Sequence, residues 1–229
     1  MSKGLIVAID GPSGVGKSTL SKSVAKTLGY LNIDTGAMYR CVALAADQKN
    51  VDPADAERLT RLSRSVRISF AQSNSGERVF LDDVDVTDAI RTPGISLLTP
   101  KIAAVPEVRE AMVALQREMG DAGGVVLEGR DVGSVVFPDA EVKIFLVATA
   151  KERGRRRYEE LRAKGVAVDF VQTVNEIEAR DLLDTTRSHS PLLKHPEAHE
   201  IDTTGLTIDQ VHSRILQIVQ NRIEQHNNR

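Results

Sequence analysis

A glycine-rich segment near the start of the chain has the residue types and spacing of a phosphate-binding loop. Residues 11–18 read GPSGVGKS, which matches the pattern GxxxxGK[ST]. Glycines let backbone N–H groups converge on a phosphate, Lys17 adds a cation, and the hydroxyl of Ser18 or Thr19 can hold Mg²⁺, directly or through water. The residues expected to bind a nucleoside triphosphate are Gly11, Pro12, Ser13, Gly14, Val15, Gly16, Lys17, Ser18 and Thr19.

The neighbours of this loop are those that a phosphate loop requires. Residues 5–10 form a continuous apolar run, typical of a buried parallel strand. A helix is expected from Lys17 to Leu28, because Leu20, Val24 and Leu28 lie four apart on one face, and Gly29 is expected to end it. The loop predicts binding and cleavage of a nucleoside triphosphate without naming the acceptor. A kinase of some other small metabolite and a nucleotide switch that regulates a partner share it.

A second candidate anion site follows the next predicted strand, at residues 30–33. A helix is expected from Thr35 to about Asp47, so its N-terminus points positive charge at any anion bound there. Arg40 lies about one turn further in and could pair with the same anion. In the alternative interpretation, Thr35 is merely a helix cap and Arg40 a surface charge.

Charged residues also follow a third apolar run, at residues 125–127. Gly129 removes bulk, so Arg130 and Asp131 can present their side chains at the strand end. An arginine beside an aspartate is commonly a solvated ion pair. At the carboxyl end of a strand in a phosphate-loop protein, ligand binding is the favoured interpretation.

Two charged helices could close over these groups. The helix predicted over residues 150–164 carries Arg153 and Arg157 on one face, at i, i+4 spacing, from which both could reach phosphates. Glutamates flank this arginine run, so some of its arginines are expected to be structural. A helix predicted over residues 170–187 carries further polar groups at roughly helical spacing, namely Arg180, Asp184 and Arg187.

The order of the predicted elements favours an α/β fold. Strands alternate with helices, which argues for a parallel sheet with helices on both faces and ligands at the carboxyl ends of its strands. Further strands are expected at residues 142–147 and 199–202, and further helices at 53–64 and 106–120. The last helix carries an apolar stripe that is expected to be core: Ile208, Val211, Ile215, Ile218 and Val219.

Residues 66–87 have a different pattern. Short alternating segments flank the turn signal Asn74-Ser75-Gly76, which predicts a small antiparallel lobe inserted between helices. The expected fold is therefore a P-loop three-layer sandwich with a central parallel sheet, a short helical lid and a small antiparallel β insertion.

Composition restricts the class of protein. The 229 residues are 41% hydrophobic and 27% charged, and the formal net charge is −2, so no basic surplus favours nucleic acid. Cys41 is the single cysteine and is expected to be a buried side chain rather than a reactive thiol. One thiol cannot form an internal disulfide, and residues 5–10 are too short to span a membrane. A cytoplasmic protein is expected.

Three histidines lie close together in the sequence. His189, His195 and His199 could in principle bind a metal, but Pro191 and Pro196 break the segment. Because no tight ligand spacing and no cysteine accompany them, they are interpreted as loop histidines.

The chain resembles the bacterial cytidylate kinases over essentially its whole length. The motifs that carry the resemblance are IDGPSGVGKST (9–19), DTGAMYR (34–40), PEVRE (106–110), EGRDVGSVVFPDAEVKIFL (128–146), RDLLDTTRSHSPL (180–192) and IDTT (201–204). The first is generic to P-loop proteins. The fourth and the lobe at residues 66–87 are specific. Glu128 and Thr35 stand where many relatives have Asp and Ser, exchanges that keep the chemical type.

The resemblance implies an enzyme that transfers a phosphoryl group from ATP, with Mg²⁺, to CMP or dCMP. The implied catalytic residues are Lys17, at the ATP phosphates, and Arg153 and Arg157, as clamps of the lid. The implied CMP-binding residues are Thr35, Tyr39, Arg40, Arg109, Arg130, Asp131, Arg180, Asp184 and Arg187. Within that set Thr35, Arg40 and Arg130 surround the phosphate, and Arg109, Asp131 and Arg187 read the base. Asp184 contacts the sugar, with Arg180 beside it.

A single domain is expected over residues 1–229, and the resemblance divides it into parts. These are a core at 1–35, 106–150 and 188–229, a monophosphate-binding region at about 36–105, and a lid with its following helix at about 151–187. Gly154 and Gly165 are expected to be hinges on which the lid closes. The expected partners are ATP and CMP or dCMP, with no nucleic acid and no membrane, and the protein is expected to be a monomer.

Overall fold

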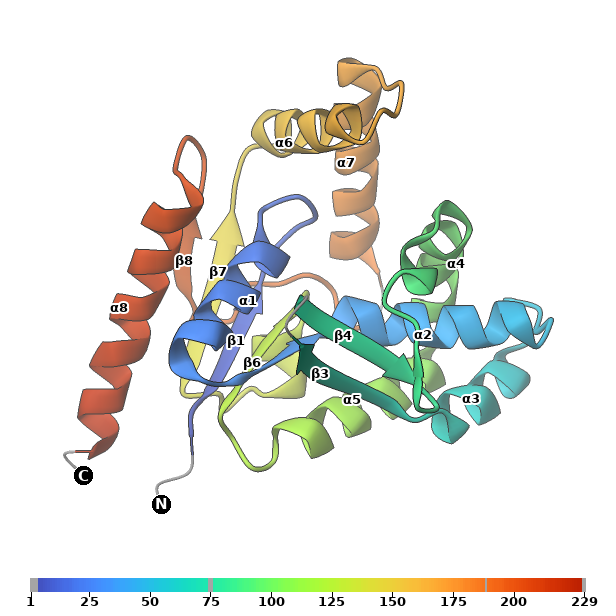
Figure 1. Cartoon of the computed structure of the whole chain (residues 1–229), viewed down its shortest axis with the longest axis horizontal. Coiled ribbons are helices and arrows are strands. Elements are labelled where there is room, and N and C mark those ends of the chain that lie inside the picture. The colour runs from blue at the N-terminus through green and yellow to red at the C-terminus, as the bar shows by residue number, and fades with distance from the viewer. Residues whose placement is uncertain (1–3, 74–75, 188, 228–229) are drawn as a thin grey trace. The chain divides into compact units, whose positions relative to one another are not determined.

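The computed structural model describes residues 4–73, 76–187 and 189–227 (Figure 1). The chain divides into two compact units, residues 1–32 with 122–229 and residues 33–121. The first unit contains these elements: β1 (Ile6–Asp10), α1 (Lys17–Leu28), β6 (Val125–Gly129), the π-helical turn η2 (Val132–Val136), β7 (Val142–Val147), α6 (Ala150–Ala163), α7 (Phe170–Thr186), β8 (His199–Asp202) and α8 (Ile208–Asn227). Strand β2 (Leu31–Asp34) begins in this unit and completes its sheet.

A five-stranded sheet with the order β2-β6-β1-β7-β8 is the centre of the first unit. β1 pairs in parallel with β6 on one side and β7 on the other, and β7 pairs in parallel with β8. Asp10, the last residue of β1, is opposite Gly129, the last residue of β6, and opposite Phe145, two residues before β7 ends. This confirms the predicted parallel α/β sheet, and every motif that follows a strand leaves from this one edge.

The core of the first unit lies between the sheet and helices α1 and α8. Val7, Ile9 and Ile144 are almost completely buried there, against Leu20 and Val24 of α1, which is why these strands read as continuous apolar runs. On α8 the predicted apolar stripe is confirmed at Val211, Ile215 and Val219. Ile208 departs from the prediction: it begins the helix and is 42% exposed.

The second unit is helical, with a small sheet. It contains α2 (Thr35–Gln48), α3 (Ala56–Ser65), β3 (Ile68–Ser73), β4 (Gly76–Leu81), β5 (Val84–Asp85), the 3-10 turn η1 (Ala89–Arg91), α4 (Pro93–Ala103) and α5 (Pro106–Gly120). β3, β4 and β5 form an antiparallel sheet, which confirms the predicted insertion. Asn74 and Ser75 of the predicted turn lie outside the described residues.

Cys41 is fully buried and burial raises the pKa of its thiol to about 12, as expected for a packed side chain.

Two features of the second unit differ from the sequence prediction. Asp34, not Thr35, caps α2: its Oδ1 accepts a hydrogen bond of 2.9 Å from the Ala37 N–H, and Thr35 is the first helical residue. Helix α4 was not predicted, because Pro100 lies inside it and proline ordinarily argues against a helix. Its start has a recognisable signal in Thr92, whose hydroxyl accepts from the Ile95 N–H, followed by a proline at the first position.

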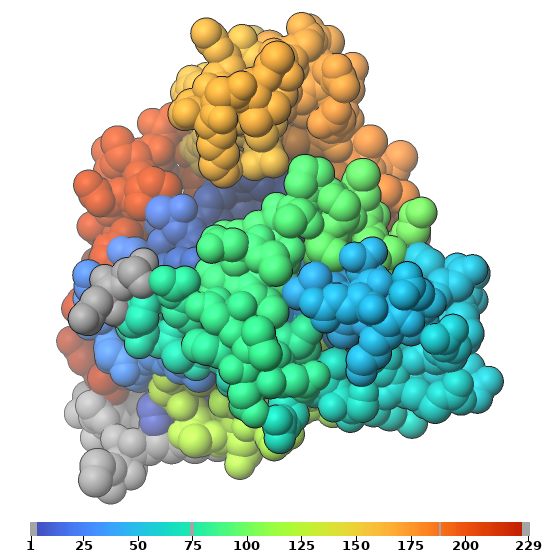
Figure 2. All heavy atoms as spheres, turned by 45° about the vertical axis from the view of Figure 1, so that its right-hand side comes forward, coloured from blue at the N-terminus to red at the C-terminus, as the bar shows by residue number. Residues whose placement is uncertain are grey.

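Helices α6 and α7 pack against each other as a hairpin, with many of their side chains at the surface (Figure 2). Gly154 lies in the middle of α6, where a Cβ would overlap Cγ2 of Val174 on α7. The expectation that Gly154 is a hinge is therefore wrong. This glycine is needed because two helices approach closely. Gly165 ends the region with a φ of +75°, a left-handed conformation that suits a helix terminus.

We expect Gly154→Ala to destabilise the protein by about 1–3 kcal/mol, because the added methyl group overpacks the α6–α7 contact. That corresponds to a fall in Tm of about 2–4 °C for each kcal/mol in a protein of this size. Gly94→Ala is the matched control, since a Cβ at Gly94 would meet no atom within 4 Å. Thermal unfolding of both variants tests this, and equal Tm values would contradict the close-packing role.

Within the described residues, we find no helix whose length and apolar character would suit it to cross a membrane.

Candidate functional site

The phosphate loop runs from β1 to α1 and holds a conformation that only its glycines permit. A Cβ on Gly11 would overlap the backbone oxygen of Leu146 on β7, so a larger residue would displace the loop from the sheet. Gly14 and Gly16 have φ angles of +75° and +97°, in the left-handed region. Left-handed residues among ordinary ones turn successive N–H groups toward one point, which makes a concave anion site.

Lys17 begins α1 and is directed back into this loop. Its Nζ donates hydrogen bonds of 2.8 Å and 2.7 Å to the backbone oxygens of Gly11 and Pro12. Burial lowers the pKa of Lys17 well below its ordinary value, and the nearby positive charge of Arg130 lowers it further. Within the described residues its hydrogen bonds go to neutral carbonyls, and the nearby carboxylates of Glu128 and Asp10 favour its charged form. An anionic phosphate that enters the loop would add a further strong interaction with this buried cation.

Hydroxyl and carboxylate oxygens lie together at the start of α1 and the end of β6. The Ser18 hydroxyl donates a hydrogen bond of 2.9 Å to Oε2 of Glu128, and the Ser21 hydroxyl lies 3.4 Å from the other carboxylate oxygen. Glu128 is 3% exposed, at the carboxyl end of β6. Hard oxygen ligands of this kind suit Mg²⁺. Of the two predicted ligands, Ser18 has this carboxylate partner, and the exposed Thr19 is the next residue of α1.

Asp10 is a buried carboxylate that the sequence analysis did not select. It ends β1, and its two oxygens accept hydrogen bonds of 2.9 Å and 2.7 Å from the N–H groups of Val132 and Gly133. These bonds fix the start of η2, directly after Arg130 and Asp131. Burial raises the pKa of Asp10 to about 6, although the two N–H groups oppose the shift. Its place at a strand end beside the glycine loop was the signal available in the sequence.

We expect Asp10→Asn to remove a pH dependence of stability. Between its ordinary pKa of 3.8 and about 6, the folded protein keeps a proton on Asp10 that the unfolded chain releases. Stability conferred by the protonated form is therefore lost as the pH rises, by at most about 1.4 kcal/mol per pH unit.

Denaturant unfolding of wild type and Asp10→Asn from about pH 4.5 to 7 measures this effect. The free energy of unfolding of the wild type should fall relative to that of the variant as the pH rises toward 6. The control is Asp139→Asn, at an exposed aspartate that should show no such trend. A constant difference between wild type and Asp10→Asn across this range would exclude the raised pKa.

The partners of Arg130 and Asp131 lie on α7 and directly after it. Nε of Arg130 donates a hydrogen bond of 2.8 Å to Oδ2 of Asp184 on α7. Asp131 is 6% exposed, and its Oδ1 lies 3.9 Å from Nη2 of Arg187. Arg130 is thus bound to Asp184, and four of the predicted acceptor residues form two ion pairs. Arg180, one turn before Asp184, is exposed and close enough to Lys17 to lower its pKa.

The second unit positions the remaining predicted acceptor residues. Nη1 of Arg40 donates to the Ile90 backbone oxygen at 3.2 Å and to the Ser96 hydroxyl at 2.8 Å, so α4 supports it. The guanidinium of Arg109 lies 5.3 Å from the ring centre of Tyr39, in a cation–π contact. Thr35 is buried at the start of α2. These residues of α2 and α5 belong to one compact unit.

The arginines of α6 differ in what they bind. Arg153 is 5% exposed and reaches the phosphate loop, where its Nη1 donates a hydrogen bond of 3.0 Å to the Ser13 backbone oxygen. Arg157 is half-exposed, and its Nη1 donates to Glu160 at 2.8 Å. Of the two predicted phosphate clamps, Arg153 therefore occupies the carbonyl side of the loop, and Arg157 has a partner on its own helix.

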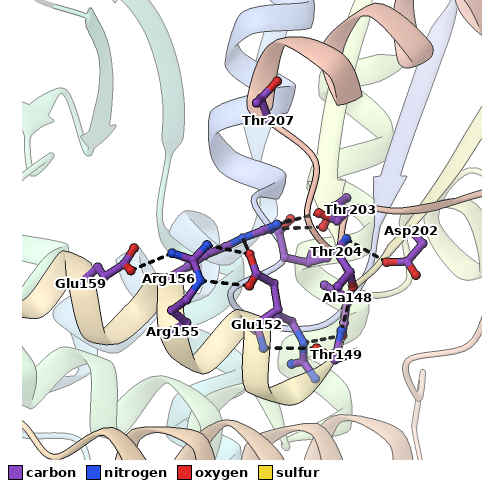
Figure 3. Close-up of polar contacts among 12 residues, drawn as sticks. Ala148, Thr149, Glu152, Arg155, Arg156, Glu159, Asp202, Thr203, Thr204 and Thr207 are labelled. Carbon is purple, nitrogen blue, oxygen red and sulfur yellow. Dashed lines mark hydrogen bonds and ion pairs between the residues drawn. The ribbon is translucent and has the colours of Figure 1, made fainter.

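Arg156 was not selected from the sequence, yet it has partners in three segments, and Figure 3 shows its partners Glu152 and Thr203. It donates to Glu152 on α6, to the Thr203 hydroxyl and backbone oxygen at 3.1 Å and 2.7 Å, and to the Val15 backbone oxygen at 3.4 Å. Arg155 instead bonds Glu152 and Glu159 at the surface. The contacts of Arg155 and Arg156 agree with the expectation that some arginines of this run are structural.

Comparisons with known proteins cover nearly the whole chain. A sequence model of a family described as Cytidylate kinase matches residues 7–221. A curated cytidylate kinase from Syntrophotalea carbinolica is 57% identical over 222 residues, 97% of this chain and 94% of that protein. One from Geobacter sulfurreducens is 52% identical over 220 residues, 96% of this chain and 94% of that protein. Among solved structures, an uncharacterized protein from Eubacterium ventriosum has a TM-score of 0.54 at 12% identity, over 96% and 99% of the two chains, a likeness of fold alone.

Proposed function

The chain belongs to the cytidylate kinase family, and from that membership we propose that it transfers the γ-phosphoryl group of ATP to CMP or dCMP, giving ADP and CDP or dCDP, a step of pyrimidine nucleotide metabolism. One structural observation supports this most directly. Asp10 is opposite Gly129 in adjacent strands, so the phosphate loop and Arg130 leave the same sheet edge side by side. A donor and an acceptor phosphate bound there would be neighbours.

On the donor side, ATP lies along residues 11–19, with its β-phosphate in the N–H concavity of the loop. Lys17 exchanges its carbonyl partners for phosphate oxygens and stabilises the charge that develops on the transferred group. Mg²⁺ bound with ATP would supply further charge neutralisation, and Ser18 with Glu128 would hold it. Arg157 leaves Glu160 to reach the phosphates, and Arg153 adds positive charge behind the loop.

On the acceptor side, the CMP phosphate is already ionised near neutral pH, so the chain needs no general base to activate it. Thr35, Arg40 and Arg130 surround this phosphate and neutralise it. Arg109, Asp131 and Arg187 read the base, with Tyr39 supporting Arg109 through the cation–π contact. Asp184 contacts the sugar, with Arg180 beside it.

Water would compete with CMP for the transferred group, so the site must be enclosed during the reaction. We assign this to the lid of α6 and α7, residues 151–187, from which Arg153 contacts the phosphate loop at the Ser13 backbone oxygen. The rest of the domain would be a core at 1–35, 106–150 and 188–229 and a monophosphate-binding region at about 36–105. The enzyme would act as a cytoplasmic monomer on small-molecule substrates, without nucleic acid or membrane.

The proposed function is tested by coupled measurement of ADP release with a panel of acceptors. CMP and dCMP should stimulate ADP release strongly over ATP alone, with UMP weaker and purine monophosphates and sugars inactive. Stimulation by a non-nucleotide acceptor would favour the wider class of small-metabolite kinases. Slow ADP release that no acceptor accelerates would favour a nucleotide switch.

A further inference from the structure

Asp181 on α7 binds a buried arginine whose other hydrogen bonds to the described residues go to backbone oxygens. Its Oδ2 accepts a hydrogen bond of 2.5 Å from Nη2 of Arg153, while Nε and Nη1 of that guanidinium donate to the backbone oxygens of Ala148 and Ser13, each at 3.0 Å. The Arg153 side chain is 6% exposed. The second oxygen of Asp181, Oδ1, is buried without a hydrogen-bond partner among the described residues. The carboxylate is thus directed at Arg153.

The contact with Ser13 has a consequence for the phosphate loop. In a planar trans peptide the carbonyl oxygen of one residue and the N–H of the next point in opposite directions. Arg153 holds the Ser13 oxygen on the side of α6, and this turns the Gly14 N–H away from α6. Gly14 is left-handed at this point, and a Cβ there would lie 3.3 Å from Cβ of Arg153. The orientation of one phosphate-binding N–H therefore depends on the position of the arginine.

A second carboxylate on the same helix holds the acceptor-side arginine. Asp184 follows Asp181 by three residues, and its Oδ2 accepts from Nε of Arg130 at 2.8 Å. Residues three apart lie on one face of a helix. Helix α7 therefore presents one aspartate to the arginine of the ATP loop and another to the arginine beside the acceptor.

We propose that Asp181 is a positioning residue for the donor nucleotide: by fixing Arg153 against the Ser13 carbonyl, it keeps the phosphate loop in its ATP-binding conformation. This inference rests on the proposed function, because it assumes that ATP occupies the loop. It predicts that loss of the carboxylate weakens the binding of ATP and leaves the binding of CMP largely unaffected. A role limited to joining α6 and α7 would instead lower stability or affect both substrates alike, since both helices belong to the lid.

Asp181→Asn keeps the size of the side chain and removes its charge. We expect it to raise the KM for ATP, and the Kd for a non-hydrolysable ATP analogue measured by calorimetry, by about tenfold, as for the loss of one charged hydrogen bond. The KM for CMP should change by less than about twofold, because Asp184 still holds Arg130. Glu178→Gln removes one charge from an exposed site on α7 and should leave both constants unchanged.

Two further variants separate positioning from packing. Asp181→Glu places the carboxylate one methylene further from the backbone and should recover part of the ATP affinity. This variant also tests the proposal if Asp181→Asn folds poorly, because it keeps the charge that binds Arg153. In an Arg153→Met background, Asp181→Asn should raise the KM for ATP no further, since its effect passes through that arginine. The proposal is overturned by equal changes in both KM values, by no recovery with Asp181→Glu, or by a full effect without Arg153.

The wild-type protein distinguishes this inference from the proposed function. If wild type binds the ATP analogue and Asp181→Asn weakens that binding, the positioning role holds even where CMP is not phosphorylated. If wild type phosphorylates CMP and Asp181→Asn binds ATP normally, the function stands and the positioning role fails.

Discussion

Lys17→Ala is expected to reduce kcat by about a thousandfold, the loss that follows removal of one preorganised group stabilising transition-state charge. The fold should survive, because the hydrogen bonds that the buried ammonium makes to the described residues go to the backbone oxygens of Gly11 and Pro12, within its own loop. Removing it leaves two carbonyls to be hydrated and relieves the cost of burying a cation. The decrease should appear in kcat more than in the KM for CMP, because the proposed CMP-binding residue Arg130 follows β6 and is not part of the phosphate loop.

Lys26→Ala is the control for this variant, because Lys26 is an exposed lysine on the same helix. It should retain wild-type kcat. Circular dichroism and thermal unfolding establish that both variants are folded, and initial rates at saturating ATP and CMP give kcat. A folded Lys17→Ala protein with near-normal kcat would contradict the assignment of residues 11–19 as the catalytic phosphate loop.

Asp131→Ala is expected to reduce kcat/KM for CMP by about 10- to 150-fold, the cost of about 1.5–3 kcal/mol for a charged hydrogen bond lost in a site shielded from water. Cytosine has an amino donor at N4 beside acceptors at N3 and O2, whereas uracil has an acceptor at position 4 and a donor at N3. A carboxylate accepts from the cytosine amino group and repels the uracil oxygen. The preference for CMP over UMP should therefore shrink in the variant.

The ratio of the two kcat/KM values separates base recognition from general support of the site. Asp131 lies within 3.9 Å of Arg187, so a purely supporting role would weaken CMP and UMP by the same factor. In that case the ratio would match that of wild type. Asp139→Ala, at an exposed aspartate further along the same segment, should change neither substrate.

Local signals in the sequence predicted the sheet and the phosphate loop correctly. The predicted bounds of the first helix, Lys17–Leu28, and of the strand Val142–Val147 agree with α1 and β7. Glycine before a helix, glycine after it and a continuous apolar run are properties of neighbouring residues, so they need no knowledge of the fold.

Errors arose where tertiary contacts decide the role of a residue. Gly154 is a flexible residue in isolation, and only the position of Val174 makes it a packing residue. Pro100 argues against a helix locally, yet α4 continues through it with Thr92 capping its start. In both cases packing from distant segments outweighed the intrinsic preference of the residue.

In the candidate site, too, local signals were predicted from the sequence and tertiary contacts were not. The arginines and aspartates at strand ends could be selected by type and position. Their partners could not, because Arg130 binds Asp184, 54 residues away, and Arg153 binds Asp181 and a loop carbonyl 140 residues away. Asp10 is the clearest omission: its importance lies in two backbone N–H groups that the fold brings to it from 122 and 123 residues away.

The most direct test of the proposed function follows the γ-phosphoryl group itself. Purified protein is incubated with CMP, Mg²⁺ and ATP labelled in its γ-phosphate, and the nucleotides are separated. We predict that the label appears in the β-phosphate of CDP, with one CDP formed for each ADP. Label in inorganic phosphate, with ADP formed and no labelled CDP, would show that water accepts the group and would contradict the assignment as a cytidylate kinase.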